Sequence, residues 1–151
     1  LDYFMKLLTD AADHPRRIFQ SPFPLENVSL LVHNGISTKY AQRADSYETI
    51  ASAIESICSA HKGNYLVFFP SYAYLAAVLE QFKERLPERQ LLVQDRGMTE
   101  AAREAFLAQF SASNPETLVG LAVMGGIFGE GIDLVGERLI GAVVVGVGDE
   151  G

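Results

Sequence analysis

Short apolar runs alternate along the chain with longer segments whose apolar positions recur at helical spacing. Residues 45–60 illustrate the helical spacing, with Ile50, Ile54 and Ile57 on one face of the expected helix. Five runs have the length and apolar character of strands: residues 28–33, 65–69, 91–93, 118–124 and 142–145. This alternation predicts an α/β fold in which βαβ units form a mostly parallel sheet of about five strands, covered by helices.

Polar residues at the segment boundaries predict where the helices begin. Asp45 stands in the cap position of the helix expected over residues 45–60, and Ser71 and Thr99 precede two later helical segments. A further short helix is expected over residues 1–8. Because ligands of parallel sheets bind beyond the carboxyl ends of the strands, the loops that begin at Pro70, Gln94 and Gly125 are the candidate site.

Composition narrows the class of protein. The chain has 151 residues, of which 48% are hydrophobic, enough for one compact domain, and no run has the length of a membrane helix. Its net charge of −7 argues against a strongly electrostatic nucleic-acid binder. With a single cysteine, Cys58, an internal disulfide and a four-thiolate metal site are both excluded, and we expect Cys58 to be a buried structural thiol.

The loop after residues 118–124 is the most informative segment. Glycines at positions 125, 126, 129 and 131 let the backbone approach a ligand and point its amides at an anion, while Glu130 and Asp133 add carboxylates beside them. A bare turn with solvated carboxylates is the competing interpretation.

Two other strand ends carry polar groups. A phosphate suits the Ser71 hydroxyl at a helix N-terminus, and Tyr72 or Tyr74 can stack on a base. Gln94 and Arg96 follow the third run and can contact a phosphate or a neighbouring domain. For each of these segments, an ordinary helix cap or a polar loop is the alternative that spacing alone favours.

Two formal motifs limit what the chain does by itself. The pattern G-x-x-x-x-G-K-S/T of a phosphate-binding loop is absent, so we expect no ATP hydrolysis by this chain alone. Residues 146–151 spell G-x-G-x-x-G, but no helix follows within the chain, and we treat this match as accidental.

Taken in order, several segments resemble the second RecA-like domain of the XPD/DinG group of superfamily 2 DNA helicases. The opening residues 1–4 resemble the sequence after motif III, and residues 37–43 resemble a further family segment. Residues 64–72 resemble motif IV, Gln94 and the helix after it resemble motif IVa, and residues 125–133 resemble motif V. The resemblance implies a RecA-like three-layer sandwich over residues 1–151, ending before motif VI.

The resemblance also implies a function. Members are ATP-driven 5′→3′ helicases that translocate on single-stranded DNA, often in repair. Glu130, Gly131 and Asp133 would then face the ATP cleft. The residues implied for the DNA side are Ser71, Tyr72, Gln94, Gly126 and Phe128, with Thr38 and Arg43 as weaker candidates.

Other parts of such a helicase would lie outside this chain. ATP and Mg²⁺ would be shared with a first RecA-like domain, which would also carry any 4Fe–4S cluster. The chain does not begin with Met, and we expect a fragment of a longer protein or a processed product. We expect the parent protein to be cytoplasmic, or nuclear in a eukaryote.

Two different classes of protein remain as alternatives. A non-catalytic protein-interaction domain on a flavodoxin-like fold would account for the acidic charge. A Rossmann-type nucleotide-binding enzyme would need a phosphate-binding turn after residues 28–33, where only Asn34-Gly35 stands.

Overall fold

The computed structural model describes residues 19–20, 24–82, 85, 91–129 and 131–146 of the chain. Backbone contacts divide the chain into two compact units, Leu1–Val32 and His33–Gly151, which we describe separately. The helix expected over residues 1–8 lies outside the described residues.

The first unit contains a single short turn of 3-10 helix among its described residues, η1 (Leu25–Asn27). The strand predicted over residues 28–33 is wrong, because this segment has no regular secondary structure. Leu30 and Leu31 are 85% and 82% exposed. A strand is stabilised by a hydrogen-bonded neighbour and by burial of at least one face, and the described structure gives this run neither.

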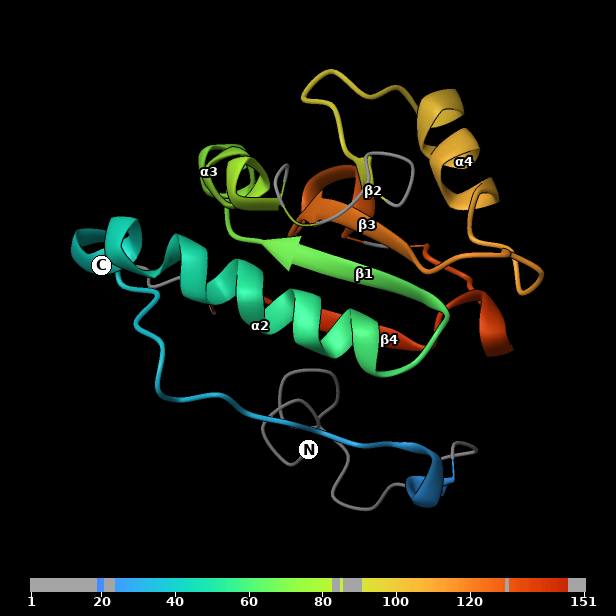
Figure 1. Ribbon diagram of the computed structural model, residues 1–151. Helices are drawn as coiled ribbons and strands as arrows, with labels where there is room; N and C mark the ends of the chain where they lie inside the picture. The colour runs from blue at the N-terminus through green and yellow to red at the C-terminus, as the bar shows by residue number, and fades with distance from the viewer. Residues whose placement is uncertain (1–18, 21–23, 83–84, 86–90, 130, 147–151) are drawn as a thin grey trace, which may run out of the picture. The chain divides into compact units, whose positions relative to one another are not determined.

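The second unit is built around a parallel sheet of four strands in the order β2-β3-β1-β4 (Figure 1). The strands are β1 (Asn64–Phe69), β2 (Leu91–Val93), β3 (Leu118–Val123) and β4 (Gly141–Val144). β1 pairs with β3 from Asn64 opposite Leu118 to Phe69 opposite Val123, so both strands reach the same edge together.

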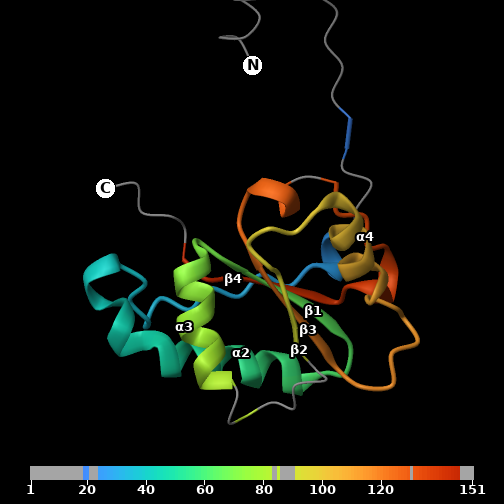
Figure 2. The same cartoon turned by 90° about the horizontal axis from the view of Figure 1, so that it is seen from above.

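Helices cover both faces of this sheet (Figure 2). Tyr65, Val67 and Phe69 of β1 pack in one apolar cluster with residues of α2 (Tyr47–Ala60) and α3 (Tyr72–Phe82). Leu66 of β1 packs in a second cluster with Phe106 of α4 (Glu100–Ala108) on the other face. The expected three-layer α/β fold is therefore confirmed, with four strands in place of about five.

Two of the three predicted helix caps are confirmed. Ser71 Oγ accepts a hydrogen bond of 3.2 Å from the amide of Tyr74, and Thr99 Oγ1 accepts one of 3.2 Å from the amide of Ala102. The cap at Asp45 is wrong, because a 3-10 segment, η2 (Tyr40–Ser46), leads directly into α2 and makes Ser46 the N-cap residue. Ser46 Oγ donates to the Arg43 carbonyl instead of accepting from the helix.

Cys58 is the buried structural thiol that the sequence predicts. It is 2% exposed within the cluster under α2, and burial raises the pKa of its thiol to about 12. In the described part of the chain, no group of three or more metal-ligating side chains comes together. The helices among the described residues are all too short or too polar to cross a membrane.

Candidate functional site

Parallel pairing brings the three candidate loops to one edge of the sheet. The amide of Met124 donates to the Phe69 carbonyl at 2.8 Å, and the amide of Gln94 donates to the Leu121 carbonyl at 2.9 Å. The segments after β1, β2 and β3 therefore leave the sheet side by side. They enclose a pocket of about 350 Å³ lined by Tyr72, Gln94, Arg96, Met98, Val123, Met124, Gly125, Gly126 and Ile127.

Gln94 links β3 to Tyr72 by two side-chain hydrogen bonds. It is 5% exposed, and its Oε1 accepts a 2.7 Å hydrogen bond from the amide of Val123. Its Nε2 donates to the Tyr72 hydroxyl, also at 2.7 Å. Because both ends of the side chain are used within the protein, Gln94 positions Tyr72 rather than reaching out to a ligand.

Tyr72 supports Arg96, which the sequence indicates as a contact for a phosphate or a neighbouring domain but which is not among the residues implied for the DNA side. The Arg96 guanidinium carbon lies 5.3 Å from the centre of the Tyr72 ring, within the range of a cation–π contact. Arg96 is exposed and lines the pocket, and within the described structure it forms no salt bridge. Its place in the loop that follows β2 is the sequence feature that indicates it.

Gly125 and Gly126 form the opposite wall of the pocket. Their φ angles of +77° and +56° lie in the left-handed region that only glycine adopts without strain. No heavy atom lies within 4 Å of the position that a Cβ atom would take at either residue. The backbone here is thus open to a ligand, as the glycine pattern predicts.

Phe128 departs from its predicted position on the DNA side. Its side chain is 3% exposed and lies in the cluster under α4, with its ring centre 4.9 Å from that of Phe106. The family resemblance implies a position nearer the DNA strand for this residue, whereas its ring is buried within the domain. Phe128 instead anchors the loop to the body of the domain.

The second half of the loop turns away from the pocket and is held against α4. Arg103 Nη2 donates to the Gly131 carbonyl at 2.8 Å, while Arg103 Nη1 bonds to Glu100 Oε1 at 2.8 Å. Asp133 is exposed, and its carbonyl lies 3.4 Å from Arg138 Nη1. Glu130 lies outside the described residues. Neither Gly131 nor Asp133 lines the pocket.

The weaker candidates lie near the same edge without lining the pocket. Arg43 Nε donates to the Thr38 carbonyl at 2.9 Å, and its guanidinium carbon lies 4.8 Å from the centre of the Tyr74 ring. A Cβ atom on Gly146, just after β4, would come within 3.0 Å of Thr38 Cβ. Ser71 caps α3 beside them.

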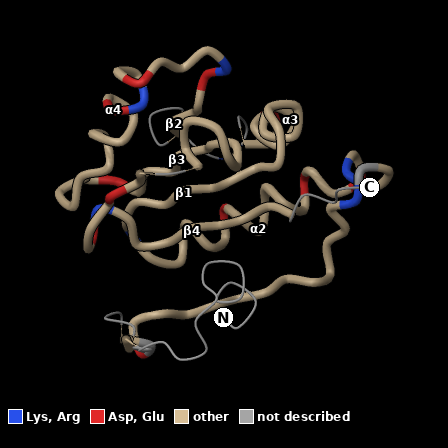
Figure 3. The backbone as a smooth tube through the Cα atoms, turned by 180° about the vertical axis from the view of Figure 1, so that it is seen from behind, with Lys and Arg blue, Asp and Glu red and all other residues tan. Residues whose placement is uncertain are grey.

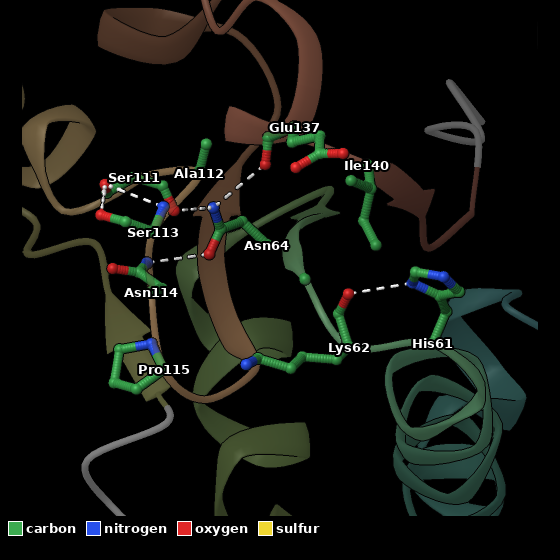
Figure 4. A pocket seen from close by; sticks show the side chains of 11 residues that line it. His61, Lys62, Asn64, Ser111, Ala112, Ser113, Asn114, Pro115, Glu137 and Ile140 are labelled. Carbon is green, nitrogen blue, oxygen red and sulfur yellow. Dashed lines mark hydrogen bonds between the residues drawn. The ribbon is translucent and has the colours of Figure 1, made fainter.

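A pocket of about 370 Å³ at the opposite, amino edge of the sheet contains none of the predicted residues (Figure 4). Its wall is built from structural hydrogen bonds around the buried Asn64, whose Nδ2 donates to the Ser111 carbonyl at 2.8 Å and whose Oδ1 accepts from Asn114 at 2.9 Å. The carboxyl edge, in contrast, combines open backbone, an aromatic ring and a cation in the segments that follow its strands.

Charge supports a local rather than a broad attraction for an anion. Basic positions in the described chain are distributed over several elements and interspersed with acidic ones (Figure 3). With a net charge of −7, the molecule has no overall attraction for an anionic polymer.

The fold and the carboxyl-edge pocket define the chain as an α/β domain of the kind that binds ligands beyond its strand ends. Residues 54–148 match the helicase C-terminal domain family, more than half of the chain, and the protein belongs to that family. The resemblance to the second, RecA-like domain of an XPD/DinG-type helicase is confirmed by this match. It also favours the helicase interpretation over the flavodoxin-like and Rossmann-type alternatives.

One curated relative supports the same conclusion. The chain is 27% identical over 128 residues to a protein of Methanocaldococcus jannaschii described as a probable ATP-dependent helicase. The alignment covers 84% of this chain and 19% of the relative. The chain thus spans about a fifth of the relative's length and belongs, by its family match, to the helicase C-terminal domain family.

Proposed function

We propose that this chain is the second motor domain of an ATP-dependent 5′→3′ DNA helicase that translocates on single-stranded DNA in repair or replication. The observation that carries the proposal is the convergence of Tyr72, Gln94 and Gly126 in one pocket at the carboxyl edge of the sheet. Because the chain belongs to a helicase family, we expect nucleic acid to be the ligand of this pocket.

The pocket suits contacts that do not depend on base sequence. Open backbone at Gly125 and Gly126 lets a sugar–phosphate chain approach closely, and the Tyr72 ring lies beside it. Such contacts to phosphates and base faces hold a strand in any sequence, as a translocating motor requires.

The segment around Gly131 and Asp133 would couple ATP binding in the interdomain cleft to DNA binding in this pocket. Arg103 donates a hydrogen bond to the Gly131 carbonyl, and Arg138 donates one to the Asp133 carbonyl. The segment follows Gly125 and Gly126 in the same loop, but these bonds hold it outside the pocket. A first RecA-like domain closing over this segment would shift the wall that the strand contacts.

The residues described here do not fit a complete site for ATP and Mg²⁺. The sequence has no phosphate-binding loop, and no cluster of metal-ligating side chains occurs among the described residues. We therefore assign most of the nucleotide site, and any 4Fe–4S cluster, to the first motor domain of the parent protein.

Two measurements on the purified chain test the proposal. A fluorescein-labelled oligothymidylate should bind at low salt with a rise in fluorescence anisotropy, and binding should weaken as salt increases. ATP turnover should be absent with and without the oligonucleotide. Robust ATP hydrolysis, or no binding at low salt, would contradict the assignment. Adding the separately expressed first motor domain should restore DNA-stimulated hydrolysis.

A further inference from the structure

We propose that Arg96, held against the ring of Tyr72, is the cation that binds a backbone phosphate of single-stranded DNA in the carboxyl-edge pocket. This inference rests on the proposed function and names the group within the pocket that provides its affinity. Gln94 is then a positioning residue, because it holds the Tyr72 ring on which the Arg96 guanidinium lies.

The support beneath Arg96 is unusually well fixed for a loop residue. Tyr72 is held by the 2.7 Å hydrogen bond from Gln94 Nε2, and Gln94 is held by the 2.7 Å bond from the amide of Val123 in β3. The guanidinium then lies 5.3 Å from the Tyr72 ring centre. A stacked guanidinium keeps the N–H donors on its edge available for bidentate binding of a phosphate.

The positive charge of Arg96 is also not neutralised by an acidic side chain among the described residues. The side chain is exposed. Other described arginines already bond to carbonyls of the domain: Arg43 to Thr38, Arg103 to Gly131 and Arg138 to Phe110. In an acidic chain, this leaves Arg96 as the cation that lines the pocket.

The opposite wall leaves room for the phosphate that Arg96 would bind. Gly125 and Gly126 present no side chains, and the positions of their absent Cβ atoms have no heavy atom within 4 Å. A phosphate could come from a DNA strand or from a nucleotide. We commit to the strand, because the chain belongs to the helicase C-terminal domain family and its sequence lacks the phosphate-binding loop that would hold a nucleotide.

The test compares variants of this chain by oligothymidylate anisotropy over a series of salt concentrations. We expect Arg96→Met to weaken binding roughly ten-fold at low salt, the loss of one charge-assisted contact. The slope of log affinity against log salt should become shallower by about 0.7, the value for one phosphate contact on a single strand. Arg96→Lys should keep the slope but lose part of the affinity, because an ammonium group lacks the planar fork.

Lys62→Met is the matched control, since it removes an exposed cation at the opposite edge of the sheet. It should bind as the unaltered chain does. Tyr72→Leu removes the supporting ring and leaves the charge, so affinity should fall while the slope stays unchanged. Circular dichroism melting of each variant separates loss of contact from loss of fold.

The outcomes distinguish this inference from the proposed function. If Arg96→Met and Lys62→Met behave alike while the unaltered chain binds DNA, the role of Arg96 is overturned and the proposed function stands. If the unaltered chain does not bind, both are overturned. A parallel titration with a fluorescent ATP analogue covers the other phosphate source. Loss of nucleotide binding in Arg96→Met, with oligothymidylate binding intact, would also overturn the inference.

Discussion

At the scale of single residues, the carboxyl-edge pocket depends on a lining side chain whose polar atoms are both used within the protein. Gln94 is buried, and its amide satisfies the Val123 N–H and the Tyr72 hydroxyl at once. Removing a buried partner costs more than the hydrogen bond contributes, because the groups left behind lose their contact with water as well.

We therefore predict that Gln94→Ala lowers the free energy of unfolding by about 1–3 kcal/mol and weakens single-stranded DNA binding. Urea denaturation followed by circular dichroism measures the first effect, and anisotropy at low salt measures the second. Gln109→Ala is the control, since Gln109 is exposed at the end of α4. Equal stability of the two variants would show that the Gln94 bridge contributes nothing.

Cys58 gives a prediction for alkaline pH. Burial raises the pKa of its thiol from 9.0 to about 12, so the folded state favours the protonated form more than the unfolded state does. Its contribution to stability is complete below pH 9 and is lost as the pH rises toward 12. Burial also raises the pKa of Tyr65, which acts in the same direction.

The melting temperature should accordingly fall as the pH rises above 9, and it should fall less steeply in Cys58→Ala. Differential scanning calorimetry of both proteins across this range measures the two slopes. Iodoacetamide should alkylate Cys58 slowly in the folded chain and rapidly in denaturant. Parallel pH curves for the two proteins would mean that the thiol does not titrate as its burial requires.

At the scale of elements, close packing of α4 against β3 depends on a glycine. A Cβ atom at Gly120 would come within 2.6 Å of Phe110 and 2.9 Å of Leu66. Both side chains are fully buried and have little room to move.

Gly120→Ala should therefore destabilise the domain by about 1–3 kcal/mol through overpacking. Gly97→Ala is a matched control, because nothing lies within 4 Å of its Cβ position and its φ is not in the left-handed region. Urea unfolding curves of the two variants make the comparison. A stable Gly120→Ala variant would mean that α4 lies farther from the sheet than described.

A second prediction at this scale concerns the contact between α4 and the glycine-rich loop. Arg103 bonds to the Gly131 carbonyl, and its guanidinium carbon lies 5.9 Å from the centre of the Phe128 ring. Arg103→Met keeps an apolar stem but removes these contacts. Hydrogen exchange at the amides of Gly126–Phe128 should become faster, while the exposed neighbour variant Glu104→Gln should leave it unchanged. Unchanged exchange in Arg103→Met would show that Phe128 packing alone fixes the loop.

The elements also show what the sequence could and could not predict. Continuous apolar runs were enough to locate all four strands, both the largely buried β1 and β3 and the edge strands β2 and β4, although Val144 of β4 is 58% exposed. The run at residues 28–33 has the same composition but remains without a sheet partner, and composition carries no information about pairing. Parallel topology then predicted that the loops after β1, β2 and β3 would meet.

Individual site residues were harder to predict, because burial of a side chain is set by packing between distant segments. Phe128 was expected beside DNA but is buried against Phe106. Gln94 was expected to contact DNA but is satisfied internally. Arg96 gains its cation–π contact only because Tyr72, the first residue of α3, comes beside it.

At the scale of the whole molecule, an acidic chain is expected to bind an acidic polymer at one edge. The net charge of −7 opposes general attraction, so binding must come from the local geometry of the carboxyl-edge pocket. A weak, salt-sensitive interaction suits a motor domain, which has to release the strand in every cycle. Tight, salt-insensitive binding would not fit such a role.

The most direct test is a titration of the ¹⁵N-labelled chain with oligothymidylate, followed by amide chemical shifts. Shifts should concentrate at Tyr72, Arg96 and the Gly125–Gly126 wall, and the amides of Lys62, Ser113 and Asn114 at the amino edge should stay unchanged. Shifts centred on the amino-edge pocket, or none at any oligonucleotide concentration, would contradict the assignment of this domain to a single-stranded DNA motor.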